Sequence, residues 1–211
     1  MWSHLPAFLG ACLLVAASPG PSTVLIIRQS LHSRRAGMWT VLGNESGVFL
    51  WGVLAALGLT AVLDASEVAY DIVRIAGGAV LVGFGVQTLR AARRTAGEGF
   101  PAGGAQSAGG ARTSAFRAYR AGLLLNLANP KAGVFAMAFL PQFVPDGAPH
   151  LTTMLLLAAV WAVFETGYYA CYVWGVSRLA SFLARGGVRR RIEQVSGGVM
   201  VALGVRLALE A

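Results

Sequence analysis

Charged residues are scarce in this sequence, and their scarcity excludes a soluble domain as its fold class. Asp, Glu, Lys and Arg make up 12% of the 211 residues and hydrophobic residues 56%, and the mean hydropathy is +0.63. A soluble domain carries about a quarter of charged residues. The composition therefore predicts an integral membrane protein, with a length that suits one bundle of about six spanning helices of roughly 20 residues each.

Cysteine is also rare, and motifs of catalysis or metal binding are lacking. Cys12 and Cys171 both lie in apolar stretches without metal-ligand spacing, which indicates packing roles. We find no phosphate-binding loop, no cluster of metal ligands and no nucleophile beside a base, so we expect no enzyme, no cofactor and no metal. The net charge of +8 comes from basic residues that lie mainly between apolar runs, so we expect no nucleic-acid partner.

Hydropathy predicts six apolar spans separated by polar gaps. The spans cover Leu5 to Ile27, Met38 to Leu63, Val68 to Leu89, Ala121 to Leu140, Leu151 to Trp174 and Ile192 to Leu209. Of the 17 basic residues, 14 lie in the first, third and fifth gaps, whereas the second and fourth gaps hold no Lys or Arg. Because basic residues favour the cytoplasmic side, these three gaps are predicted to be cytoplasmic and both termini external.

The six spans divide into two halves of three, residues 1–94 and residues 118–211, joined by residues 95–117. This joining segment is rich in Gly, Ala, Ser and Pro, and it is expected to be a flexible cytoplasmic linker within one membrane domain. At an offset of 120 residues, Glu45-Ser46-Gly47 aligns with Glu165-Thr166-Gly167. Because the two halves start on opposite sides, we predict an all-α fold of two inverted-topology repeats, with chance similarity between Gly-rich apolar segments as the alternative.

Proline interrupts the first and the fourth span, and we call these two interruptions the breaks. Proline and glycine continue a helix poorly, and non-helical backbone inside a membrane is tolerated only where it faces protein or a water-filled cavity. The half-helix after each proline offers free amides to an anionic group such as a carboxylate, although a kink that only aids packing is the alternative. We therefore expect the residues at both breaks to bind a substrate: Pro19, Gly20, Pro21, Asn126, Asn129, Pro130 and Lys131.

Three ionisable residues lie inside predicted spans and away from the span ends, namely Glu45, Lys131 and Glu165. A charge at the centre of a spanning helix costs roughly 2.5–3.5 kcal/mol, so such residues are functional candidates. Desolvation favours the neutral carboxyl group, which suits proton uptake and release, whereas pairing with Lys131 favours the carboxylate. Glu45 and Glu165 are therefore our candidate proton-coupling residues, with a structural salt bridge or helix–helix hydrogen bond as the alternative.

Three motifs in this order resemble those of the LysE/RhtB-type amino-acid exporters, and the resemblance covers the whole chain. They are Ser18-Pro19-Gly20-Pro21, Asn129-Pro130-Lys131 and Phe139-Leu140-Pro141-Gln142-Phe143. The resemblance implies a secondary transporter of the bacterial inner membrane that exports amino acids or related metabolites, driven by the proton-motive force. Its partners would be the small-molecule substrate, protons and membrane lipid, and formation of a homo-oligomer stays open.

Other functions remain alternatives at this point. An exporter of cations or of other solutes that are not amino acids would have the same spans. A channel or a non-transporting scaffold would be indifferent to the protonation of Glu45 and Glu165.

The predicted orientation can be tested by labelling. In a background lacking Cys12 and Cys171, we expect Ser107→Cys and Asp146→Cys to react with an impermeant thiol reagent from opposite sides of the membrane, because they lie in gaps of opposite predicted location. Labelling of both positions from one side would contradict the six-span count or its orientation.

Overall fold

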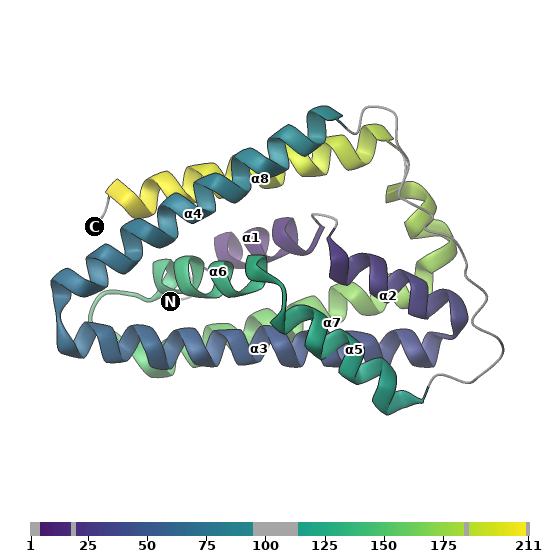
Figure 1. The fold of residues 1–211 in the computed structure, drawn as a ribbon, viewed down its shortest axis with the longest axis horizontal. Coiled ribbons are helices and arrows are strands. Elements are labelled where there is room, and N and C mark those ends of the chain that lie inside the picture. The colour runs from purple at the N-terminus through teal and green to yellow at the C-terminus, as the bar shows by residue number, and fades with distance from the viewer. Residues whose placement is uncertain (1–4, 18–19, 95–113, 184–185, 210–211) are drawn as a thin grey trace.

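The computed structural model describes residues 5–17, 20–94, 114–183 and 186–209, and every regular element in these ranges is a helix. The all-α prediction is therefore confirmed for the described part of the chain (Figure 1). In chain order the elements are α1 (Leu5–Ala17), α2 (Pro21–His32), α3 (Arg34–Ala65), α4 (Glu67–Arg94), α5 (Ala115–Leu127), α6 (Pro130–Phe139), the short 3-10 helix η1 (Leu140–Phe143), α7 (His150–Leu183) and α8 (Gly186–Leu209).

Three of these helices are long and apolar enough to cross a membrane by themselves, through Arg34–Val62, Asp71–Arg90 and His150–Gly175. Two further pairs of helices, α1 with α2 and α5 with α6, pass the same test if each bent pair counts as one span. The described residues thus contain three to five candidate spans. Six spans remain a prediction, since the sixth would be α8, which is not among these candidates.

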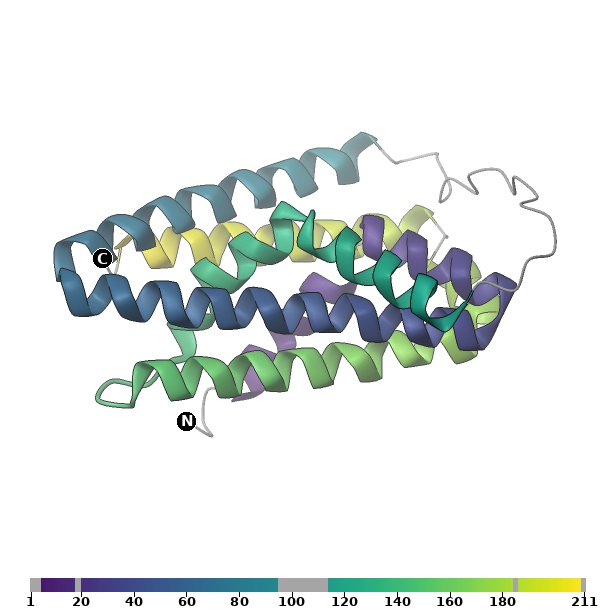
Figure 2. The same cartoon turned by 60° about the horizontal axis from the view of Figure 1, so that its bottom comes forward.

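The local sequence explains where the helices stop at the two breaks. Gly20 has extended backbone (φ −142°, ψ −178°) and Pro21 opens α2, so the α1–α2 pair is bent by 67°. Asn129 caps α6 because its side-chain oxygen accepts a hydrogen bond from the Lys131 amide at 3.1 Å, and the α5–α6 pair is bent by 60°. Both breaks lie midway along the length of the molecule (Figures 1 and 2).

The helix ends that carry arginine lie together at one end of the molecule (Figures 1 and 2). These ends are the α2–α3 junction with Arg34 and Arg35, the last turns of α4, the first turn of α5 and the start of α8. The opposite end holds the α3–α4 junction and the start of α7. We call the end with the arginine-carrying helix ends the basic end. Its location in the cytoplasm remains a prediction.

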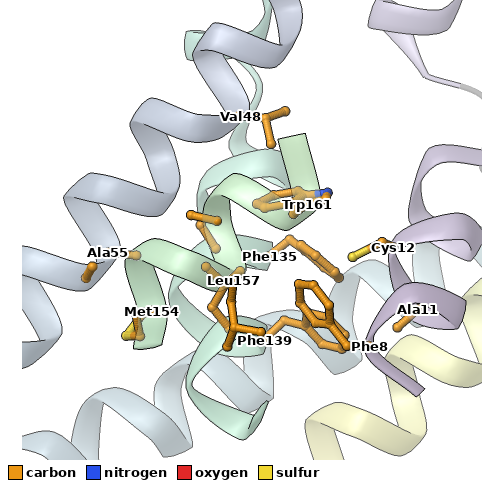
Figure 3. Packing of buried hydrophobic residues seen from close by; sticks show 14 of the residues in the cluster. Phe8, Ala11, Cys12, Val48, Ala55, Phe135, Phe139, Met154, Leu157 and Trp161 are labelled. Carbon is orange, nitrogen blue, oxygen red and sulfur yellow. The ribbon is translucent and has the colours of Figure 1, made fainter. Parts of the chain in front are cut away.

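An apolar core fills the half of the molecule away from the basic end, between α1, α3, α6 and α7. Figure 3 shows the rings of Phe8, Phe135 and Phe139 beside one another, with Trp161 next to Phe135. The ring centroids of Phe135 and Phe139 are 4.1 Å apart, and those of Phe135 and Trp161 are 4.8 Å apart. Aromatic packing therefore holds α1 against α6 through Phe8 and Phe139, and α6 against α7 through Phe135 and Trp161.

A second, smaller apolar cluster lies nearer the basic end, between α2, α3 and α7. We call it the tyrosine cluster, and its buried members are Ile26, Val41, Tyr169, Tyr172 and Val173. The core and the tyrosine cluster are separated along both long helices by polar residues. On α3 these are Asn44 and Glu45, and on α7 the separating residue is Glu165.

Glycines allow two helix pairs to approach closely. A Cβ at Gly85 of α4 would collide with the backbone of α8 at Gly197, and a Cβ at Gly204 would collide with Gly78. In the same way Gly43 of α3 faces the backbone of α5. Small residues permit such contacts between membrane helices. The α4–α8 contacts are those that an inverted repeat would produce, and the repeat itself remains a prediction.

The linker expected at residues 95–117 falls mostly outside the described residues, which resume at Ser114. Its last three residues, Ala115 to Arg117, form the first turn of α5, where the Ser114 side chain accepts a hydrogen bond from the Arg117 amide at 3.2 Å. The boundaries of the two halves are otherwise untested by the described chain.

We expect the close α3–α5 contact to be sensitive to a single added methyl group. Gly122→Ala would press against the Thr40 carbonyl, so it should lower the free energy of unfolding by about 1–3 kcal/mol, as overpacking does. Gly58→Ala is the control, because a Cβ at Gly58 meets nothing within 4 Å. Midpoints of thermal unfolding in detergent measure the difference, and equal midpoints would mean that α3 and α5 are free to separate.

Candidate functional site

A cavity of about 480 Å³ lies between the two breaks. Its wall comes from the end of α1, the first turn of α2, the middle of α3, the later part of α4, both sides of the second break and one face of α7. Six of the residues expected to act in binding or coupling line it: Gly20, Pro21, Asn126, Asn129, Lys131 and Glu165. The structure thus brings together residues that are more than a hundred positions apart in the sequence.

The other three predicted residues have different positions. Pro19 lies outside the described residues. Pro130 opens α6 at the second break, next to the cavity-lining Asn129 and Lys131. Glu45 is buried, with 4% of its surface exposed, but it is not part of the cavity wall.

Lys131 connects the two breaks. It is the one lysine of the sequence. It stands in the first turn of α6, and its ammonium group donates a hydrogen bond to the backbone oxygen of Val15 in α1 at 3.3 Å. The carboxyl end of a helix carries partial negative charge, which a cation there stabilises. The side chain therefore binds the end of α1 across the cavity, a contact that spacing in the sequence does not reveal.

Glu165 projects from α7 into the same cavity and is 4% exposed. It is close enough to Lys131 and to Glu45 to interact electrostatically with both. Its Oε1 atom is buried and has no hydrogen-bond partner among the described residues. Lys131 therefore donates no hydrogen bond to this oxygen.

Glu45 is connected to the cavity through two asparagines. Its Oε1 atom accepts a hydrogen bond from Asn44 Nδ2 at 2.8 Å, and Asn44 Oδ1 accepts one from Asn126 Nδ2 at 3.2 Å. Trp51 Nε1 in turn donates to the Asn126 backbone oxygen at 3.3 Å. Asn44 and Asn126 both line the cavity, so these hydrogen bonds connect Glu45 to the cavity wall.

Several buried polar atoms around the cavity lack a hydrogen-bond partner among the described residues. They include Ser22 Oγ, Asn126 Oδ1 and Glu165 Oε1, and all three residues line the cavity. Buried polar groups in proteins are nearly always hydrogen-bonded, so these atoms indicate a cavity suited to a polar ligand. Asn126 and Glu165 offer acceptors for N–H donors, while Lys131 supplies a positive charge.

Sequence reasoning missed several polar residues of the cavity wall. Ser22 and Thr23 follow the first break directly, so their neighbours Gly20 and Pro21 could have pointed to them. On α7, the spacing of Trp161, Glu165 and Tyr169 puts all three on one helical face, and this regular spacing around Glu165 was a usable signal. Asn44, Gln87 and Thr88 carry no comparable signal in the sequence.

Two bent helix pairs that border a cavity lined by a lysine and a glutamate, between long apolar helices, define a class, that of membrane transport proteins. A family model described as "LysE type translocator" matches residues 13–211. The chain therefore belongs to the LysE type translocator family. The resemblance noted from the break motifs is thereby confirmed.

Relatives of known name cover nearly the whole chain. The homoserine/homoserine lactone efflux protein of Salmonella typhimurium is 27% identical over 203 residues, which is 96% of this chain and 94% of the relative. The threonine efflux protein of Escherichia coli K12 is 27% identical over 205 residues, 93% of each chain. The membrane protein YrhP of Bacillus subtilis is 21% identical over 206 residues, 97% of this chain and 98% of the relative. No solved structure matches the chain.

The cavity can be tested by its access to a small hydrophilic reagent. In the background lacking Cys12 and Cys171, Thr88→Cys should react with a small charged thiol reagent in detergent, because Thr88 lines the cavity. Val173→Cys is the control on a fully buried side chain outside the wall, and its reaction should be slower by a factor on the order of ten or more. Equal rates would contradict an accessible cavity.

Proposed function

We propose that this protein is a secondary transporter that exports an amino acid or a closely related metabolite across the bacterial inner membrane in exchange for protons. The observation that carries the proposal is the cavity between the two breaks, whose wall combines one ammonium group, of Lys131, and one carboxyl group, of Glu165. An amino acid carries the complementary pair of charges. The names of the efflux relatives support the same class of substrate.

Lys131 is the proposed partner of the substrate carboxylate. Its ammonium group contacts Val15 O in a single long hydrogen bond, and a carboxylate would compete with this carbonyl for the same donor. The first turn of α2 faces the same cavity with Gly20, Pro21 and Ser22, and the free amides of a helix start favour an anion. Asn129 and Pro130 contribute by starting α6 so that Lys131 stands in its first turn.

Glu165 and Asn126 are the proposed partners of the substrate ammonium group. Each has a buried oxygen that accepts no hydrogen bond from the described residues. A substrate with N–H donors would satisfy both oxygens, whereas an apolar solute would leave them unpaired at a cost of about 1–3 kcal/mol each. This difference favours amino acids over apolar metabolites of similar size.

At least one of Glu45 and Glu165 is proposed to carry the exchanged proton. The two carboxyl groups interact electrostatically, so proton uptake by one changes the charge that the other meets. The other titratable groups of the described residues that interact with this pair are Lys131, Tyr169, Tyr168 and Cys12. Glu165 borders the cavity directly, and Glu45 reaches it through Asn44, so either could link protonation to substrate binding.

The proposed orientation places the basic end in the cytoplasm, with both termini outside. Arginine-rich gaps at one end of the molecule support it, because such gaps are retained on the cytoplasmic side. Export then means loading of the cavity from the basic end and release at the other.

Transport by purified protein in liposomes tests the proposal. With a pH gradient imposed, the wild-type protein should accumulate one or more amino acids, with homoserine and threonine as the first candidates. Lys131→Ala should raise the apparent KM by about 10- to 100-fold, the range for loss of a hydrogen bond to a charged group. If no amino acid is moved or exchanged by well-folded protein, the proposed substrate class is wrong.

The carboxyl groups are tested in the same liposomes. Glu45→Gln or Glu165→Gln mimics a permanently protonated side chain, so at least one should exchange substrate at equal pH yet fail to accumulate it against a gradient. Asp64→Asn is the control, because Asp64 is exposed at the end of α3 away from the cavity. Full accumulation by both Gln variants, singly and together, would show that the carboxyl groups are structural.

A further inference from the structure

Side chains from three helices hold the carbonyl groups near the end of α1. Ser196 Oγ of α8 donates to Leu14 O at 2.6 Å, Lys131 Nζ of α6 donates to Val15 O at 3.3 Å, and the Tyr169 hydroxyl of α7 donates to Ala16 O at 3.4 Å. The last carbonyls of a helix have no partner within it and must find one elsewhere. The end of α1 at the first break is therefore positioned from outside, by the rest of the bundle.

Tyr169 differs from the other two side chains because it also contacts the far side of this break. Its hydroxyl lies 3.4 Å from Thr23 Oγ1, in the first turn of α2. A tyrosine hydroxyl has one proton, which it donates to Ala16 O, so it accepts the hydrogen bond from Thr23. Ala16, Thr23 and Tyr169 are all buried and all line the cavity. One hydroxyl group thus joins both halves of the bent span.

The same residue relates α2 to the carboxyl group of the cavity. Tyr169 follows Glu165 by four residues, so both stand on the same face of α7, one turn apart. The Tyr169 ring packs against Tyr168 and Tyr172, with ring centroids 5.2 and 5.9 Å away, which limits the positions open to it. A fixed ring with a hydroxyl bound to Thr23 sets the distance between the first turn of α2 and Glu165.

We propose that Tyr169 is a positioning residue for substrate binding, whose hydroxyl holds the first turn of α2 in register with Glu165 across the first break. The inference rests on the proposed transport function, in which α2 meets one end of the substrate and Glu165 the other. Tyr169 acts through Thr23 and Ala16, so its removal loosens the geometry of both binding groups without removing either. Substrate affinity should fall, while the maximal rate stays near that of the wild type.

Tyr169→Phe is the direct test, since it removes the hydroxyl and keeps the ring. We expect the KM for the transported amino acid to rise by about three- to tenfold, the range for one hydrogen bond between neutral groups, with little change in kcat. Tyr172→Phe is a matched control on the same helix and in the same tyrosine cluster. The Tyr172 hydroxyl contacts Tyr168 at 2.9 Å and does not line the cavity, so its loss should leave the KM within about twofold.

A double-mutant cycle separates positioning from direct contact with the substrate. If Tyr169 acts through Thr23, the Tyr169→Phe and Thr23→Val effects on KM should not add, and the double variant should match the more severe single variant. If Tyr169 bound the substrate by itself, the two effects would multiply, and the proposal would be overturned. Thr23→Val combined with Tyr172→Phe serves as the reference pair, in which independent effects are expected.

Each remaining outcome also decides the question. An unchanged KM in Tyr169→Phe overturns the proposal. If Tyr169→Phe cannot be recovered as folded protein, the test falls on Thr23→Val alone. This variant should raise the KM by about three- to tenfold, the range for loss of one hydrogen bond. An unchanged KM in Thr23→Val overturns the proposal. Failure of the wild-type protein to transport any amino acid contradicts the proposed function itself, whereas wild-type transport with multiplying effects contradicts only the role of Tyr169.

Discussion

The hydrogen-bonding needs of backbone groups inside a membrane govern this structure. A helix that continues satisfies its own amides and carbonyls, and a helix that breaks in the hydrocarbon region must find partners in the surrounding protein. Here the chain breaks twice, and the two breaks meet at one cavity. Ser196, Lys131 and Tyr169 satisfy the carbonyls before the first break, and Asn129 caps the helix after the second. These contacts connect α6, α7 and α8 to the end of α1.

The two long helices α3 and α7 divide the interior into three zones. Apolar residues at one end of each helix join the aromatic core, and residues at the other end join the tyrosine cluster. Between them each helix carries one buried carboxyl group, Glu45 on α3 and Glu165 on α7. A charge costs most at the centre of a membrane, and both carboxyl groups lie in the zone that also holds Asn44, Asn126 and Lys131. The polar zone, with the cavity on its surface, thus lies between two apolar clusters.

The helices differ in how tightly they are fitted to their neighbours. Glycines bring α4 against α8 and α3 against α5 so closely that a methyl group would not fit. At the first break the contacts are side-chain hydrogen bonds, two of them as long as 3.3 and 3.4 Å. The glycine-packed helix pairs are therefore held by close backbone packing, whereas the end of α1 is held by side-chain hydrogen bonds.

Much of this organisation could be read from the sequence, because a membrane constrains single residues strongly. Pro21 and Pro130 interrupt apolar runs, and Glu45, Lys131 and Glu165 are charges where charge is costly, so each residue is conspicuous without any knowledge of its neighbours. The bends at both breaks and the burial of both carboxyl groups agree with that reading.

What the sequence could not decide is which polar groups meet across helices. These meetings depend on the rotation and register of neighbouring helices. Examples are the position of Glu45 outside the cavity wall and its hydrogen bonds through Asn44 to Asn126. The hydrogen bond from Lys131 to Val15 and the position of Tyr169 across the first break are further examples. Rotation and register are set by packing between segments far apart in the chain, such as the glycine contacts of α3 with α5, and no local pattern of residues records them.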